Sequence, residues 1–149
     1  MSRLFEPIAL RRLDLPNRIM VSPMCQYSAI DGSATPWHYA HLGSLALSGA
    51  GFMSVEATAV NAQGRITPGC LGLYSDANEA ALAPIVAMIR HSSPVKVAIQ
   101  LAHADRKGSS NVSSLGGKQI GIDAGGWKAV APSALSHGEG EALPHALSG

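Results

Sequence analysis

Residues 18–25 have the sequence RIMVSPMC, and this stretch decides between the two folds that the chain's pattern allows. The apolar run Ile19–Val21 is typical of a buried strand, and Pro23 ends it because proline cannot donate a hydrogen bond to a sheet. A doubly wound nucleotide-binding fold would place a glycine-rich turn directly after its first strand. Serine, proline, methionine and cysteine follow this strand instead, which favours a (β/α)8 barrel.

Strand and helix patterns alternate after this stretch. Thr35 and Pro36 mark a helix start, because a capping side chain is followed by proline at the first helical position. Gly49–Gly51 ends that helix. Strands that alternate with helices predict an α/β fold with a parallel sheet. The other expected elements are a hairpin of Leu4–Leu10 and Arg12–Leu15, strands at Arg18–Met24, Phe52–Ala59 and Val95–Leu101, and a helix capped by Asp76 that runs to about Arg90.

The length of the chain limits how much of a barrel it can form. A complete barrel needs about 250 residues, whereas this chain has 149 and holds at most three strand–helix steps. Three parallel strands alone would leave an apolar edge unpaired. We therefore expect residues 1–149 to be an incomplete domain, the N-terminal portion of a (β/α)8 TIM barrel. Residues 104–149 hold much of the glycine and serine and predict a long excursion loop.

Composition excludes several classes of partner and site. Hydrophobic residues make up 46% of the chain and the formal net charge is +1, so no strong field attracts nucleic acid or a membrane surface. The first residues carry charge and lack the apolar segment of a secretory signal, so a cytoplasmic protein is expected. Cys25 and Cys70 fit no zinc or thioredoxin spacing, and a disulfide between them is not expected in that compartment.

Barrel enzymes place their chemistry at the carboxyl ends of the strands. In this sequence those ends are Ser22–Tyr27, Glu56–Ala59 and Gln100–His103. This selection names candidates from fold logic alone and does not name a reaction.

Each candidate has a structural and a functional interpretation. Cys25 is a cofactor contact, a nucleophile or a buried structural thiol, and no spacing ties an activating histidine to it. Gln100 is either a core amide or an amide that binds the edge of a planar heterocycle. Glu56 is either paired structurally or catalytic. His38 and His41 alone make an incomplete metal site, so we interpret them as structural and predict no metal.

The chain also resembles a known family. Five motifs follow the order found at the start of the old yellow enzyme family, in its cysteine-bearing branch of xenobiotic reductases and bacterial NADPH dehydrogenases. They are LFEPIALRRLDLPNRIMVSPMCQYSAIDG (residues 4–32), TPWHYAHL (35–42), GAGFMSVEATAVNAQGRITPGCLGLYSD (49–76), VAIQLAHADRK (97–107) and APSAL (131–135). The likeness covers nearly all of the chain and is weakest over residues 108–128.

The resemblance implies a barrel with FMN at its carboxyl mouth. Gln100 corresponds to the amide that bonds the flavin pyrimidine edge, and Cys25 to the thiol that tunes the flavin's reduction potential. Tyr27 corresponds to the tyrosine that reaches the substrate carbonyl, so Cys25 and Tyr27 are the implied catalytic residues. The implied cofactor contacts are Ser22, Pro23, Met24, Cys25, Ala57 and Gln100.

The implied reaction is that of an ene-reductase. Hydride passes from NADPH or NADH through FMN to the C=C bond of an α,β-unsaturated carbonyl compound. Assembly into a homo-oligomer is expected of the complete protein by analogy. The alternatives are a non-catalytic fragment, a flavin-free binding module, and an iron–sulfur dienoyl-CoA reductase relative.

One departure from the family motif falls in the turn at residues 103–106. The family commonly has His-Ala-Gly-Arg there, whereas this chain has aspartate at position 105. Glycine permits a positive φ, and aspartate tolerates that conformation better than most residues. We expect the turn to persist, while the role of Arg106 stays open.

Overall fold

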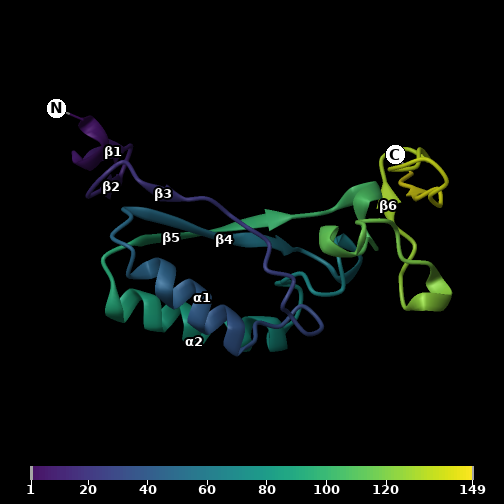
Figure 1. The fold of residues 1–149 in the computed structure, drawn as a ribbon, viewed down its shortest axis with the longest axis horizontal. Helices are drawn as coiled ribbons and strands as arrows, with labels where there is room; N and C mark the ends of the chain where they lie inside the picture. The colour runs from purple at the N-terminus through teal and green to yellow at the C-terminus, as the bar shows by residue number, and fades with distance from the viewer. Residues whose placement is uncertain (1, 149) are drawn as a thin grey trace.

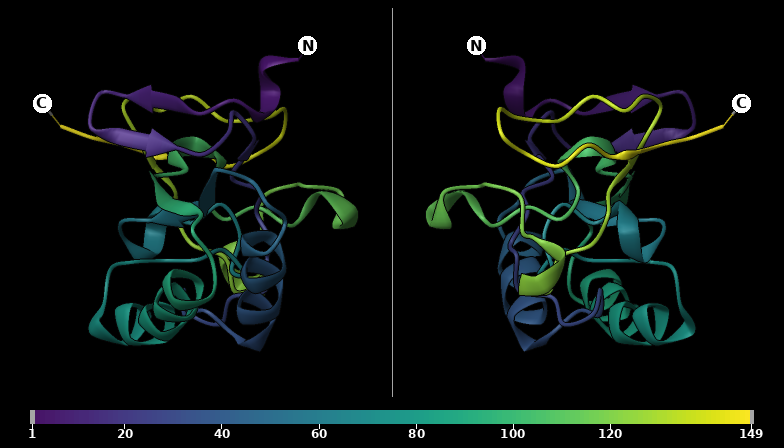
Figure 2. Two further views of the ribbon diagram at one scale, coloured as in Figure 1. Left: turned by 90° about the vertical axis from the view of Figure 1, so that its left-hand side faces the viewer. Right: turned by 90° about the vertical axis from the view of Figure 1, so that its right-hand side faces the viewer.

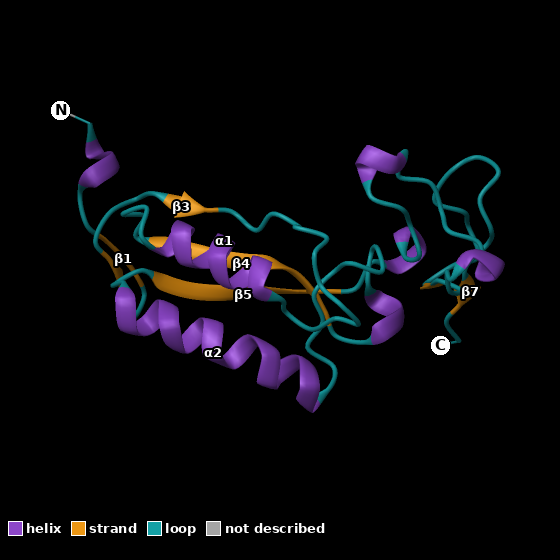
Figure 3. Cartoon of the chain, turned by 60° about the horizontal axis from the view of Figure 1, so that its bottom comes forward, coloured by secondary structure: helices purple, strands orange, loops and turns teal. Residues whose placement is uncertain are grey.

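The computed structural model describes residues 2–148, and its centre is a three-stranded parallel sheet. The strand order is β3-β4-β5, and α1 and α2 connect the strands while covering one face of the sheet (Figures 1 and 3). The strands are β3 Met20–Val21, β4 Phe52–Ala59 and β5 Lys96–Ala102, and the helices are α1 Pro36–Ala46 and α2 Asp76–Ser92. This order confirms the predicted α/β pattern.

Local capping chemistry sets the start of each helix. Thr35 caps α1 as predicted, and the Nδ1 atom of His38 accepts the backbone N–H of Thr35 at 3.0 Å. Ser75 caps α2, accepting the N–H of Asn78 at 3.2 Å. The prediction of Asp76 as the cap is wrong by one residue. Its carboxylate lies in the first turn instead, where the helix dipole favours a negative charge.

The hydrophobic core lies between the helices and the sheet. Met53 of β4 and Ile89 of α2 are both 0% exposed. Alternation along β4 sends Met53 and Val55 toward the helices, which contribute apolar side chains at helical spacing. The buried cluster is Ala29, Leu42, Ala46, Met53, Val55, Leu71, Leu82, Ile85, Ile89 and Val95.

The first strand of the sheet is shorter than the sequence suggests. Within residues 18–24, the apolar run Ile19–Val21 was predicted to be a buried strand that ends at Pro23, but only Met20 and Val21 pair with β4. Met20 is 53% exposed. In this chain β3 lies at the edge of the sheet, so one side of it has no strand to pair with, and Pro23 follows two residues later.

The two ends of the sheet carry different attachments. The predicted hairpin forms from β1 Ile8–Leu10 and β2 Leu13–Leu15 and lies near the amino ends of the strands. Residues 103–148 extend from the carboxyl ends on the opposite side (Figures 1 and 2). The elements there are short: 3-10 turns at Asp105–Lys107, Ser113–Leu115 and Ile122–Ala124, and the pair β6 Val130–Ala131 and β7 His145–Ala146.

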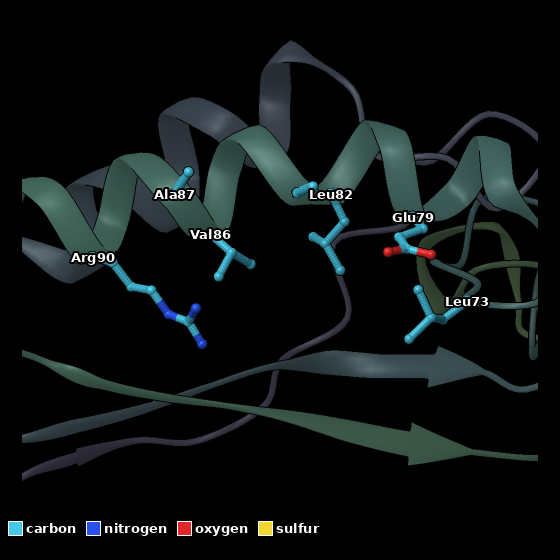
Figure 4. Close-up of a pocket in the computed structure, with 7 residues that line it drawn as sticks. Leu73, Glu79, Leu82, Val86, Ala87 and Arg90 are labelled. Carbon is cyan, nitrogen blue, oxygen red and sulfur yellow. The ribbon is translucent and has the colours of Figure 1, made fainter.

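The sheet is an open arc, so the barrel does not close within this chain. One flank of α2 borders a shallow pocket that faces the strands (Figure 4). The pocket is lined by Leu73, Glu79, Leu82, Ala83, Val86, Ala87 and Arg90. Among residues 2–148, no helix combines the length and apolar composition needed to cross a membrane.

Candidate active site

A β-bulge in β4 sets the geometry of the carboxyl end of the sheet. Val55 pairs with Ile99 and Ala57 pairs with Gln100, so Glu56 is an extra residue between two regular pairs. Without the bulge, the carboxylate of Glu56 would lie opposite Gln100. With it, the methyl group of Ala57 takes that position and Glu56 turns toward α1. Bulges are used in this way beside active sites, where they redirect a side chain.

Glu56 is a structural clamp. Its carboxylate is 4% exposed, and Oε2 accepts the backbone N–H of Gln26 at 3.0 Å. Oε1 lies 3.5 Å from Nε2 of His38. Because Nδ1 of His38 accepts the Thr35 N–H, the ring proton sits on Nε2 and faces the carboxylate. The clamp therefore joins β4, α1 and the turn after β3, which answers the open question about Glu56 in favour of structural pairing.

The two predicted structural histidines have separate partners. His38 is buried against Glu56, whereas the ring of His41 stacks on Trp37 with centroids 6.3 Å apart. Within residues 2–148, no three histidine, cysteine, aspartate or glutamate side chains gather in a metal-binding group.

Cys25 lies in the turn after β3, with its thiol partly exposed. The backbone N–H of Ala57 and the thiol of Cys70 are neighbours of its sulfur, and the Ala57 N–H acts to lower the pKa of Cys25. The hydrogen bond with Cys70 is the main cause that raises the pKa of Cys25 above its usual value, and burial and the nearby Glu56 charge act in the same direction. Cys25 therefore holds its proton, which disfavours a role as a lone thiolate nucleophile.

The structure shows a neighbour of Cys25 that sequence reasoning missed. Cys70 is 1% exposed and is a neighbour of Cys25, although nothing in the sequence links the two residues. The thiol of Cys25 and the hydroxyl and backbone N–H of Thr67 stabilise its charged form, and together they lower the pKa of Cys70 to about 6. No spacing rule predicts this contact, because a whole strand–helix–strand unit separates the two cysteines.

Gln100 and Cys25 are both neighbours of Ala57. Gln100 is the cross-strand partner of Ala57 in β5, and its amide is exposed. Since Val55 and Ile99 pack against the helices, the next pair, Ala57 and Gln100, faces the side that the helices leave open. A flat heterocycle needs a small side chain beneath it and an amide with free donor and acceptor groups at its edge. Both features are present here, so these residues fit a flavin.

Tyr27 has a strained backbone. Its φ is +53°, in the left-handed region that bulky residues rarely adopt and that often marks functional sites. Gly69 holds this turn: its carbonyl accepts the Ala29 N–H at 2.9 Å, and a Cβ at position 69 would meet the Tyr27 carbonyl. Burial first, and then the neighbouring thiols of Cys25 and Cys70 and the Glu56 carboxylate, raise the pKa of the Tyr27 phenol. The phenol is therefore a hydrogen-bond donor at neutral pH.

The remaining residues of the turn after β3 lie differently. Ser22 and Met24 line a small crevice shared with His41 of α1 and Ser54 of β4. Pro23 is half-buried between them. The crevice therefore joins this turn to α1 and β4.

The turn that departs from the family motif keeps a glycine-like conformation. Asp105 has φ +57°, and its Oδ1 accepts the Arg106 N–H at 2.6 Å. Arg106 in turn donates to the hydroxyl of Ser133 at 3.2 Å. The prediction that the turn persists with aspartate is confirmed, and Arg106 ties it to the later APSAL segment.

Known proteins resemble this chain in both sequence and structure. Residues 3–141 match the NADH:flavin oxidoreductase / NADH oxidase family. An NADH:flavin oxidoreductase of Gibberella zeae is 42% identical over 93% of the chain and 34% of its own length. An NADPH dehydrogenase of Listeria welshimeri is 42% identical over 99% of the chain and 40% of its own length. One from Bacillus subtilis is 46% identical over 70% of the chain and 31% of its own length.

Solved structures give the same result. Morphinone reductase superposes with a TM-score of 0.78 at 27% identity, covering 99% of this chain and 40% of that one. The old yellow enzyme homologue from Zymomonas mobilis superposes with a TM-score of 0.75 at 27% identity, again over 99% and 40%. The chain therefore spans about two fifths of the length of these relatives, and it matches their amino-terminal portion.

Proposed function

Since this chain belongs to the NADH:flavin oxidoreductase / NADH oxidase family, we propose that it forms one wall of an FMN site in an ene-reductase of the cysteine-bearing branch. The observation that carries the proposal is the junction of Cys25, Ala57 and Gln100 on the open face of the sheet. When bound, FMN accepts hydride from NADPH or NADH and passes it to the C=C bond of an α,β-unsaturated carbonyl compound.

Each residue of the junction has a defined part. The amide of Gln100 offers a donor and an acceptor together, which matches the edge of a pyrimidine ring. Ala57 leaves room for the ring to lie close to the backbone. The protonated thiol of Cys25 stands beside Ala57, where it is a weak donor toward the flavin. The turn at Ser22, Pro23 and Met24 contributes backbone contacts.

Tyr27 acts on the substrate. Its phenol stays protonated at neutral pH because burial and the neighbouring thiols raise its pKa. A positioned O–H donor stabilises negative charge that develops on a substrate carbonyl oxygen. The left-handed backbone of Tyr27 fixes where that donor points.

Titration of the chain with FMN tests the proposal. We expect bound FMN to show quenched fluorescence, and Gln100→Leu to weaken binding by about tenfold, which is about 1.4 kcal/mol and within the range for one hydrogen-bonded amide. Gln63→Leu is the matched control, since this exposed amide lies outside the strands. Equal FMN affinity for Gln100→Leu and the unaltered chain would contradict the proposal. In the chain with FMN bound, Cys25→Ala should shift the flavin reduction potential.

A further inference from the structure

Cys25 and Cys70 are neighbouring cysteines that can undergo a reaction of their own, separate from the proposed flavin site. Both cysteines are free thiols, and they come from two segments that run side by side. The Ala29 N–H bonds the Gly69 carbonyl at 2.9 Å, and Gly69 is backed directly against Tyr27. The fold therefore holds the segments of the two cysteines together, although 45 positions separate them in the sequence.

We propose that Cys25 and Cys70 form a reversible intramolecular disulfide when the protein meets a hydroperoxide. Because the bond between Ala29 and Gly69 holds the two segments together, the thiols are close neighbours. A change in the turn of Cys25 can bring the sulfurs to the S–S bond length of about 2.05 Å. Cys25 lies in a partly exposed turn rather than within a strand, so it is the sulfur that can move and that a small peroxide reaches.

The reaction is a two-electron oxidation of the pair by the peroxide. With one proton lost from the pair, the Cys70 thiolate accepts the proton of Cys25 as the Cys25 sulfur attacks an oxygen of hydrogen peroxide. The O–O bond breaks, and a sulfenic acid and hydroxide form. Hydroxide takes the proton of Cys70. The Cys70 thiolate then attacks the Cys25 sulfur, the S–O bond breaks, and a second hydroxide leaves. In sum, two thiols and one hydrogen peroxide give one disulfide and two waters.

The surroundings of Cys70 suit it to the second step. The hydroxyl and backbone N–H of Thr67 both lie 3.4 Å from its sulfur and stabilise a negative charge there. Glu56 and Tyr27 are the other titratable groups near the pair. Glu56 helps to raise the pKa of Cys25, and the two cysteines help to raise the pKa of Tyr27. An exposed attacking site beside a buried, stabilised thiolate is the arrangement of a redox-sensing pair with a resolving cysteine.

The consequence for the proposed flavin site rests on the proposed function. A disulfide would remove the only S–H hydrogen of Cys25 and draw its sulfur toward Cys70. Oxidation would then weaken the thiol's influence on the flavin, while dithiothreitol would restore it.

Thiol counting tests the disulfide without any flavin. The folded 149-residue chain is treated with equimolar hydrogen peroxide, denatured and assayed for free thiols. We expect the count to fall from two to none with loss of the mass of two hydrogens, a peptide linking positions 25 and 70, and recovery by dithiothreitol. Two remaining thiols, an interchain dimer, or over-oxidised Cys25 beside free Cys70 would each overturn the proposal.

Variants distinguish a disulfide that depends on the folded arrangement of the two cysteines from the ordinary reactivity of each thiol with peroxide. After peroxide, Cys25→Ser and Cys70→Ser should each lack the intramolecular cross-link and its loss of the mass of two hydrogens. Cys70→Ser should instead gain the mass of one oxygen at Cys25. Gly69→Ala keeps both thiols but pushes the segment away from Tyr27, so it should slow disulfide formation at least tenfold. Gly121→Ala is the matched control, because a Cβ there meets open space. The same reaction in urea should also be slower, and an equal rate there would contradict a contact made by the fold.

A further arm uses FMN itself. Saturating FMN should slow peroxide oxidation of Cys25, because the ring would cover the exposed side of the thiol. No protection would count against the proposed flavin site, whereas the disulfide would stand on the thiol counts alone.

Discussion

The unit formed by residues 20–102 and the excursion formed by residues 103–148 are held by different forces. Every residue of the buried apolar cluster lies in the first unit, where two helices pack on a sheet. The excursion is held by hydrogen bonds and isolated contacts. Trp127, for example, donates to the Gln63 carbonyl at 2.9 Å and lies 5.2 Å from the Arg65 guanidinium. The stabilisation from apolar burial adds up over many contacts, whereas each polar contact contributes a small stabilisation of its own.

This difference explains where the candidate site lies. The junction of Cys25, Ala57 and Gln100 sits at the carboxyl end of the rigid unit, so its geometry is set by the sheet register and the bulge. The excursion begins directly after β5, at the turn of Asp105. Site residues on a packed scaffold beside a loosely held segment are the usual arrangement for barrel enzymes.

The largest expected effect comes from a substitution in the hydrophobic core of residues 20–102. Ile89→Ala removes a fully buried side chain from α2, and we expect it to lower the free energy of unfolding by about 2–5 kcal/mol. Leu115→Ala in the excursion is the control: this side chain is 72% exposed, so a change within about 0.5 kcal/mol is expected. Urea denaturation measures both, and similar losses would show that the two regions share one kind of stability.

A smaller effect is expected when the anchor of the excursion is removed. Trp127→Ala deletes the hydrogen bond to Gln63 and the contact with Arg65, so we expect a loss of about 1–2 kcal/mol. Hydrogen exchange should rise within residues 109–131 while β4 and β5 stay protected. Faster exchange across the sheet would mean that the excursion supports the packed unit. Trp37→Ala, at an exposed stack on α1, is the matched control.

The smallest expected effect lies at the border between the two regions. Asp105→Gly relieves a positive φ but removes the bond to the Arg106 N–H, so the free energy of unfolding should change by less than about 1 kcal/mol. Asp105→Val keeps the unfavourable φ with a branched side chain and should destabilise by about 1–2 kcal/mol. Thermal unfolding distinguishes them, and an equal loss in both variants would show that the backbone conformation at position 105 is not what matters.

Local patterns predicted much of the first unit. Thr35 and Pro36 marked the start of α1 because capping depends on adjacent residues. Asp76 was mistaken for the cap of α2 because Ser75 beside it is an equally good capping residue. The first strand was predicted too long, because its apolar residues say nothing about how many strands pair with it.

The sequence alone determined the order of strands and helices, the family likeness and the residue types available at the strand ends, because these depend on neighbours in the chain. Only the tertiary structure decided that Glu56 turns away to His38, that Ala57 stands opposite Gln100, and that Cys70 meets Cys25. The physical reason is that a bulge changes the strand register, and packing joins segments that are distant in the sequence. Neither effect leaves a periodic signal in the residues themselves.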